Sequence, residues 1–159
     1  RFAMIWTNTM QTNALTMSKV AVVYWSGTGN TEQMAESVAD GARNAGADVT
    51  TFTAAEFDAD KMDEFDAIAF GCPSMGAEQL EEDEFEPMFT ACEAKLSGKK
   101  IALFGSYGWG DGEWMRNWEE RVQEDGATVV GGEGVICHEV PDDAAAADCI
   151  ALGKLLASA

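Results

Sequence analysis

Short apolar runs and longer amphipathic segments alternate along most of the chain. Apolar or β-branched runs predict strands, whereas apolar residues that recur every three or four positions predict helices. The expected strands cover about Lys19–Trp25, Asp48–Thr53, Ala67–Gly71, Lys100–Gly105, and a last region shared by Thr128–Val130 and Val135–Cys137. Strands that alternate with helices form parallel sheets covered on both faces. The pattern therefore predicts an α/β fold, a three-layer sandwich around a five-stranded parallel sheet in the order 2-1-3-4-5.

Four amphipathic segments predict the helices of the two outer layers. The first has an inward stripe of Met34, Ala35, Val38, Ala39 and Ala42, and it ends at Gly46. The others cover Phe85–Leu96, Glu113–Gln123, and a segment that Asp142 or Asp143 caps and that ends near Ala157. Pro87 is tolerated because it falls in the first turn of its helix.

The length of 159 residues suits a single domain. Residues 1–16 carry one charge and no sustained period, and they lack an apolar run followed by a cleavage site. We therefore expect a disordered or non-native extension at 1–16 and a domain at 17–159. No run of 18 apolar residues occurs, so no membrane-spanning helix is expected.

The charge of the chain limits its partners. It has 28 acidic and 10 basic residues and a net charge of −18. Nucleic acids and anionic membranes require basic surfaces, so neither is an expected partner. An acidic surface favours docking onto basic patches of other proteins, although it also serves solubility or a high-salt habitat. We expect a monomer that docks onto basic partners.

Cysteine and histidine give no sign of a metal site. Cys72, Cys92, Cys137 and Cys149 show no C-x-x-C spacing, and His138 is the single histidine. A zinc site is therefore not expected, and reduced thiols in a cytoplasmic protein are the simplest interpretation. His138 is assigned a structural role.

The turn after the first strand carries the clearest chemistry. Small and hydroxyl-bearing residues follow the apolar run Val20–Val23, where a buried strand leads into a helix. Such a turn gathers backbone N–H groups at the positive end of a helix dipole and so predicts a phosphate site. A nucleotide triphosphatase loop needs a lysine, and none follows Lys19 before Lys61. A dinucleotide loop needs a third glycine, and Glu32 stands there instead. The remaining interpretation is a site for one terminal phosphomonoester that neutral groups hold.

Two further loops leave the same edge of the predicted sheet, where ligands of such folds bind. They cover Gly71–Glu78 and Gly105–Gly112. The second places Trp109 among glycines, where an indole is exposed unless a flat ligand covers it. Met75 offers an adaptable surface for the opposite face of such a ligand. A site that binds a phosphate at one end and covers a flat ring with Met75 and Trp109 at the other suits flavin mononucleotide (FMN).

Three motifs carry a resemblance to a known family. The segments Tyr24–Thr31, Gly71–Gly76 and Phe104–Gly110 resemble, in order and spacing, those of the short-chain flavodoxins of anaerobic bacteria. Only 12 residues separate Thr128 from Pro141, which resembles the short type. The resemblance runs from Met17 to the C-terminus. It implies a flavodoxin-like fold, non-covalent FMN, and a low-potential electron carrier that acts on no substrate and serves redox partner proteins.

The resemblance also implies roles for single residues. The phosphate would be held by Ser26, Thr28, Asn30 and Thr31, together with the amides of Gly27 and Gly29. Met75 would cover the inner face of the flavin and Trp109 the outer face, while Glu78 would accept a hydrogen bond from flavin N3–H. The remaining candidate binding residues are Pro73, Ser74, Gly76, Ala77, Ser106, Tyr107, Gly108 and Gly110, with the Gly108 amide near the pyrimidine side. Ala77 stands where relatives often have a polar residue.

Two features of the chain predict control of the redox potentials. A flip of the Met75–Gly76 peptide would offer a carbonyl to flavin N5–H once the flavin is reduced, and glycine best tolerates the turn that this requires. The acidic residues near the site would lower the second potential by disfavouring added negative charge. They are Glu78, Glu81, Glu82, Asp83, Glu84 and Asp111. The acidic run is equally typical of a solvated helix start.

Two alternatives share this topology. An FMN-dependent quinone or azo reductase would need added loops or a dimer interface, for which the chain has little spare length. A phosphorylation receiver domain would need acidic residues where Trp25-Ser26 and Cys72-Pro73 stand.

Overall fold

The computed structural model describes residues 17–159, so the expectation for residues 1–16 lies outside the described part of the chain. The six strands all run parallel, in the order β2-β1-β3-β4, and β5 and β6 share the last position beside β4. Their bounds are β1 Lys19–Tyr24, β2 Asp48–Thr53, β3 Ala67–Gly71, β4 Lys100–Tyr107, β5 Thr128–Val129 and β6 Val135–His138. The predicted order is confirmed. Strand β4 is two residues longer than expected because Ser106 and Tyr107 pair with β6.

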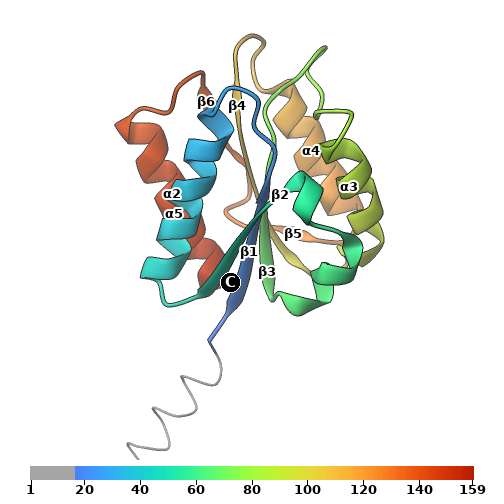
Figure 1. Ribbon diagram of the computed structural model, residues 1–159, viewed down its shortest axis with the longest axis vertical. Helices are drawn as coiled ribbons and strands as arrows, with labels where there is room; N and C mark the ends of the chain where they lie inside the picture. Colours follow the sequence, from blue (N-terminus) through green and yellow to red (C-terminus); the bar gives the residue numbers. More distant parts are fainter. Residues whose placement is uncertain (1–16) are drawn as a thin grey trace, which may run out of the picture.

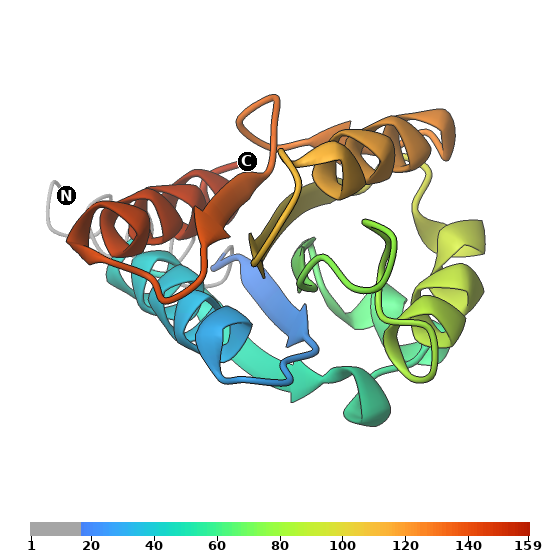
Figure 2. The same cartoon turned by 90° about the horizontal axis from the view of Figure 1, so that it is seen from above.

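Helices cover both faces of the sheet. The α-helices are α2 Asn30–Asn44, α3 Phe85–Cys92, α4 Glu113–Glu124 and α5 Asp143–Ala157. Three short 3₁₀ helices are η1 Ala54–Glu56, η2 Ala59–Glu64 and η3 Glu93–Lys95. Figures 1 and 2 show α2 and α5 together on one face and α3 and α4 on the other. Asp142, one of the two predicted caps, accepts a hydrogen bond from the Ala145 amide at 2.8 Å.

The central strand β1 contributes to both hydrophobic cores because successive side chains point to opposite faces of a sheet. Val20 and Val22 belong to the core under α2 and α5, together with Met34 and Leu152. Ala21 and Val23 belong to the other core. Burial on both faces explains why this strand reads as a continuous apolar run.

Two glycines allow α2 and α5 to touch along their backbones. A Cβ on Gly41 would collide with the Ile150 carbonyl, and a Cβ on Gly153 would collide with the Val38 carbonyl. Gly41 and Gly153 therefore form a reciprocal contact in which each helix admits the backbone of the other. This contact holds α2, whose N-terminus follows the turn predicted to bind phosphate, against the rest of the fold.

Within residues 17–159, no helix is both long and apolar enough to cross a bilayer. The same part of the chain contains no cluster of three or more histidine, cysteine, aspartate or glutamate side chains that would hold a metal ion. The four cysteines are free and buried, and burial raises the pKa of the Cys92 and Cys149 thiols to about 12.

Candidate cofactor site

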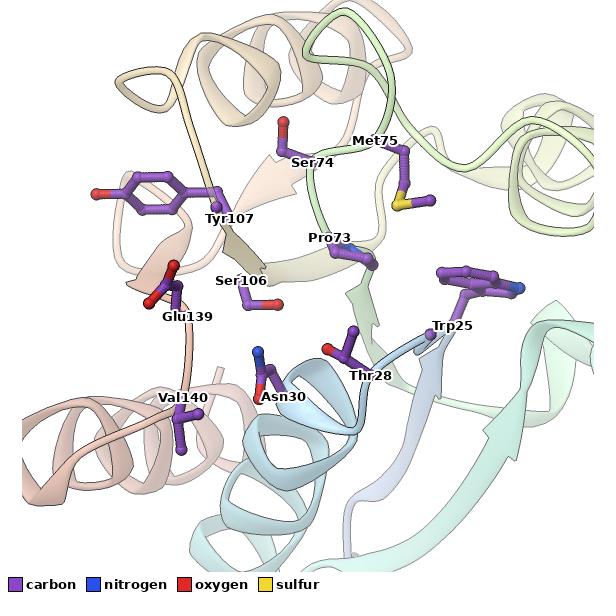
Figure 3. Close-up of a pocket in the computed structure, with 12 residues that line it drawn as sticks. Trp25, Thr28, Asn30, Pro73, Ser74, Met75, Ser106, Tyr107, Glu139 and Val140 are labelled. Carbon is purple, nitrogen blue, oxygen red and sulfur yellow. The ribbon is translucent and has the colours of Figure 1, made fainter.

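A cavity of about 470 Å³ lies at the carboxyl edge of the sheet, where the loops after β1, β3 and β4 meet. Its lining residues are Trp25, Gly27, Thr28, Asn30, Pro73, Ser74, Met75, Ser106, Tyr107, Gly108, Glu139 and Val140. Figure 3 shows Thr28 and Asn30 at one end, Ser74 and Met75 at the other, and Trp25 across from Tyr107 and Glu139. Small-molecule sites have volumes of roughly 300–1,000 Å³. The three predicted loops thus share one cavity of suitable size.

The segment Tyr24–Thr31, called the phosphate loop after its predicted role, offers backbone donors to this cavity. The Ser26 hydroxyl accepts hydrogen bonds from the amides of Gly29 at 3.1 Å and Glu32 at 3.2 Å. The amides of Gly27, Thr28 and Asn30 donate to no group of the described residues. Gly29 has a φ of 96°, which glycine adopts without strain. Free amides beside the N-terminus of a 15-residue helix suit an anion without any cationic side chain.

Thr31 lies deeper than the rest of the loop. It is only 1% exposed, and its hydroxyl forms a hydrogen bond of 2.8 Å with the Ser106 hydroxyl. Ser106 lines the cavity, whereas Thr31 does not. The structure thus joins the first loop to β4 through this pair, and a phosphate contact by Thr31 itself stays a prediction.

The aromatic end of the site is open. Trp109 is 63% exposed and Met75 is 38% exposed, as expected of side chains that a ligand would cover. Trp109, Gly110, Gly76, Ala77 and Glu78 belong to the predicted loops but do not line the cavity. That Met75 and Trp109 cover the two faces of a ligand stays a prediction.

Glu78 carries an unsatisfied acceptor. Its Oε1 atom is buried and forms no hydrogen bond within the described residues. A Cβ on Gly110 would collide with this carboxylate, so glycine at 110 leaves room for it. Glu78 itself has a φ of 53°, an uncommon conformation for a residue other than glycine. A buried oxygen without a donor costs about 1–3 kcal/mol. Glu78 does not line the cavity, so its contact with flavin N3–H stays a prediction.

The turn after Met75 already uses its carbonyl. The Met75 carbonyl accepts a hydrogen bond from the Gln79 amide at 2.9 Å, and Gly76 has a φ of 53°. A flip of the Met75–Gly76 peptide would have to break that bond. The redox role of this peptide stays a prediction.

The acidic run after this turn divides into different roles. Glu81 is 7% exposed, so the expectation of a solvated run is wrong for this residue. Its carboxylate accepts hydrogen bonds from the amides of Asp83, Glu84 and Phe85 at 2.8–2.9 Å and so caps α3. Burial raises the pKa of Glu81, but the three donors outweigh it, and the pKa lies below its ordinary value. Glu82 and Asp83 remain exposed.

Nine of the predicted residues line the cavity: Gly27, Thr28, Asn30, Pro73, Ser74, Met75, Ser106, Tyr107 and Gly108. Ser26 and Gly29 instead border a second cavity of about 380 Å³, which Gly27 and Trp25 also border. Trp25, Glu139 and Val140 line the first cavity although they were not among the predicted binding residues.

A sequence signal for two of the missed residues existed. Glu139 and Val140 follow β6, so they lie at the same carboxyl edge as the three predicted loops. Glu139 has a φ of 61°, and its amide donates to the Tyr107 carbonyl at 2.9 Å. His138 Nε2 lies 3.2 Å from the Gly108 carbonyl, which agrees with a structural role.

Comparisons with known proteins agree with this geometry. The model of the flavodoxin family matches residues 22–152. Flavodoxin from Clostridium beijerinckii is 50% identical over 137 residues, which cover 86% of this chain and 98% of that protein. Flavodoxin from Megasphaera elsdenii is 48% identical over 140 residues, which cover 88% and 99%. A solution structure of the two-electron-reduced Megasphaera elsdenii flavodoxin matches with a TM-score of 0.79 and 46% identity, covering 88% of this chain and 99% of that one. The chain therefore belongs to the flavodoxin family, whose members bind FMN and carry electrons one at a time.

Proposed function

We propose that this chain is a low-potential electron carrier that holds FMN in the cavity between its loops. The observation that supports this most directly is the joining of two unlike ends in one cavity. Free amides of a cation-free loop lie at one end, and Met75 lies at the other, with the exposed Trp109 in a neighbouring loop. Family membership places the chain among electron carriers rather than among FMN-dependent quinone or azo reductases.

Each end of the site is assigned to one part of FMN. Ser26, Thr28, Asn30 and Thr31, with the amides of Gly27 and Gly29, hold the phosphate. Met75 and Trp109 cover the two faces of the flavin, and the unpaired Glu78 Oε1 accepts from N3–H. The remaining walls are Pro73, Ser74, Gly76, Ala77, Ser106, Tyr107, Gly108 and Gly110. Bound FMN supplies reversible one-electron transfer.

The acidic side chains near the site disfavour added negative charge within it. Two unit charges ~10 Å apart in water repel by roughly 0.4 kcal/mol, and several such charges add. Glu139, at the cavity wall, joins Glu78, Glu82 and Asp83 in this role, whereas the charge of Asp111 is paired with Arg116 at 3.0 Å. These charges therefore lower the reduction potential of the site, so the carrier becomes more reducing.

Flavodoxins exchange electrons with redox partner proteins. For this chain we propose partners with basic docking surfaces, because its net charge is −18 and an acidic rim steers basic proteins toward it. A monomer suits this role. The free, buried cysteines suit a reducing compartment, which supports a cytoplasmic location.

Titration of the apoprotein with FMN tests the proposal directly. We expect a tight one-to-one complex with quenched flavin fluorescence, measured by fluorescence and by isothermal titration calorimetry. The absence of such a complex would overturn the proposed function.

Trp109→Ala tests the aromatic end of the site. Loss of the stacked indole should weaken binding by about 2 kcal/mol, or roughly 30-fold in Kd. Because the change affects the ring and not the phosphate, FMN and riboflavin should weaken by the same factor. Trp109→Phe should recover most of the affinity. Unchanged affinity in Trp109→Ala would exclude the proposed stacking.

A further inference from the structure

We infer that Trp25 is a positioning residue that holds the phosphate loop in the shape that binds a phosphomonoester. It does so through a hydrogen bond to Glu84 and through contact between its ring and Gly27. The inference rests on the proposed function, since it names what sets the affinity of that site for the phosphate.

The first contact links the phosphate loop to a distant part of the chain. Trp25 Nε1 donates to Glu84 Oε1 at 3.0 Å, across 59 positions of sequence. Trp25 directly precedes Ser26, the residue whose hydroxyl organises the loop, and Glu84 is the N-cap residue of α3. The bond therefore joins the start of the phosphate loop to the α3 side of the sheet.

The second contact supports the loop from behind. A Cβ built on Gly27 would lie 3.1 Å and 3.2 Å from two carbons of the Trp25 ring. A side chain at position 27 would crowd the indole, so glycine lets the backbone pass close to the ring. Trp25 and Gly27 border both cavities, so the indole with this backbone forms the wall between them. Figure 3 shows the ring at the edge of the first cavity with its nitrogen directed outward.

Glu84 is exposed, but its backbone is fixed by Glu81. The buried Glu81 carboxylate accepts a hydrogen bond from the Glu84 amide at 2.8 Å. The Glu81 amide donates in turn to the Cys72 thiol at 3.3 Å, in the loop after β3. A continuous series of contacts therefore runs from Cys72 through Glu81 and Glu84 to Trp25 and the phosphate loop.

Packing alone does not require an indole at this position. Trp25 is half-buried and only packs against the edge of a core cluster. A phenylalanine would fill much of the same space but would donate no hydrogen bond to Glu84. The specific effect of the indole should therefore appear at the phosphate end of the site, which separates positioning from general stability.

The test compares ligands with and without a phosphate. Apoproteins of the wild type, Trp25→Phe, Glu84→Ala and the double variant are titrated with FMN, riboflavin and inorganic phosphate. We expect Trp25→Phe and Glu84→Ala each to raise the Kd for FMN about tenfold and to weaken phosphate binding, with the Kd for riboflavin unchanged. The double variant should be no worse than either single variant, because both remove the same bond.

The charge of Glu84 allows loss of positioning to be distinguished from loss of an acidic charge. Removal of an acidic charge alone should strengthen binding of an anion, whereas loss of positioning should weaken it. Glu84→Gln keeps an oxygen that accepts from the indole, so it should bind FMN at least as tightly as the wild type. Glu82→Ala removes a neighbouring exposed charge without touching Trp25, and should behave like Glu84→Gln.

Tyr24→Phe is the matched aromatic control. It removes the hydrogen bond of 3.3 Å from the Tyr24 hydroxyl to Glu32 and should leave the ratio of FMN to riboflavin affinity unchanged. Equal weakening of FMN and riboflavin in Trp25→Phe, or no change in either, would overturn the inference. If the wild type failed to bind FMN, the proposed function would fall, and the phosphate titrations would still decide the role of Trp25.

Discussion

Gly153→Ala should lower the free energy of unfolding by about 2 kcal/mol, although alanine is the better helix former. Helix propensity alone predicts a gain of about 1 kcal/mol, because Gly153 lies inside α5. The added Cβ would meet the Val38 carbonyl of α2, a backbone group that cannot rotate away. Overpacking of this kind costs roughly 1–3 kcal/mol and forces the helices apart. The sign of the change in the free energy of unfolding therefore shows whether packing or helix propensity dominates.

Urea unfolding of the apoproteins measures this effect. Gly41→Ala, the reciprocal substitution on α2, should destabilise to a similar degree because its Cβ would meet the Ile150 carbonyl. The double variant should lose less than the two single losses together, since the first substitution already separates the helices. Ala151→Gly on the exposed side of α5 is the control and should cost about 1 kcal/mol through propensity alone. A stabilised Gly153→Ala protein would refute the backbone contact.

Glu81→Ala should also cost about 3 kcal/mol of folding free energy. Three amides lose their acceptor at once, and the hydrogen bonds of a buried carboxylate contribute more than neutral ones. Glu81→Gln should lose less, because its remaining carbonyl oxygen still accepts from some of these amides. Glu82→Ala, the exposed neighbour, should change stability by at most about 0.5 kcal/mol.

The pH dependence of stability provides an independent check on Glu81. Its pKa is lowered in the folded protein, so its carboxylate stabilises the fold above the unfolded pKa of about 4.3. That stabilisation is lost as the pH falls through the folded pKa. The difference in unfolding free energy between wild type and Glu81→Gln should therefore be full near neutral pH and shrink below about pH 4. A difference independent of pH would show that the ionised carboxylate is not the stabilising form.

The sequence alone predicted the sheet and the place of the site. Val20–Val23 reads as a strand buried on both faces, and it is the central strand of the structure. The turn after it and the glycine-flanked Trp109 predicted a phosphate end and an exposed aromatic end, and the structure has free amides and an exposed indole there. The prediction of the sheet succeeds because periodicity and strand order act locally or through general rules of topology. The binding roles of the two ends stay predictions.

Other features depend on segments that meet only in the folded protein. In the sequence, Gly41 and Gly153 indicate only weakened helices, because glycine is a poor helix former. The structure shows that the backbones of the two helices touch at these glycines. Glu81 reads as one member of an acidic run until three amides converge on it. The hydrogen bond from Trp25 to Glu84, which joins residues 59 positions apart, belongs to the same class. The hydrophobic pattern of a sequence indicates which face of a helix or strand is buried. The partner that a side chain contacts depends on how elements distant in the sequence pack together.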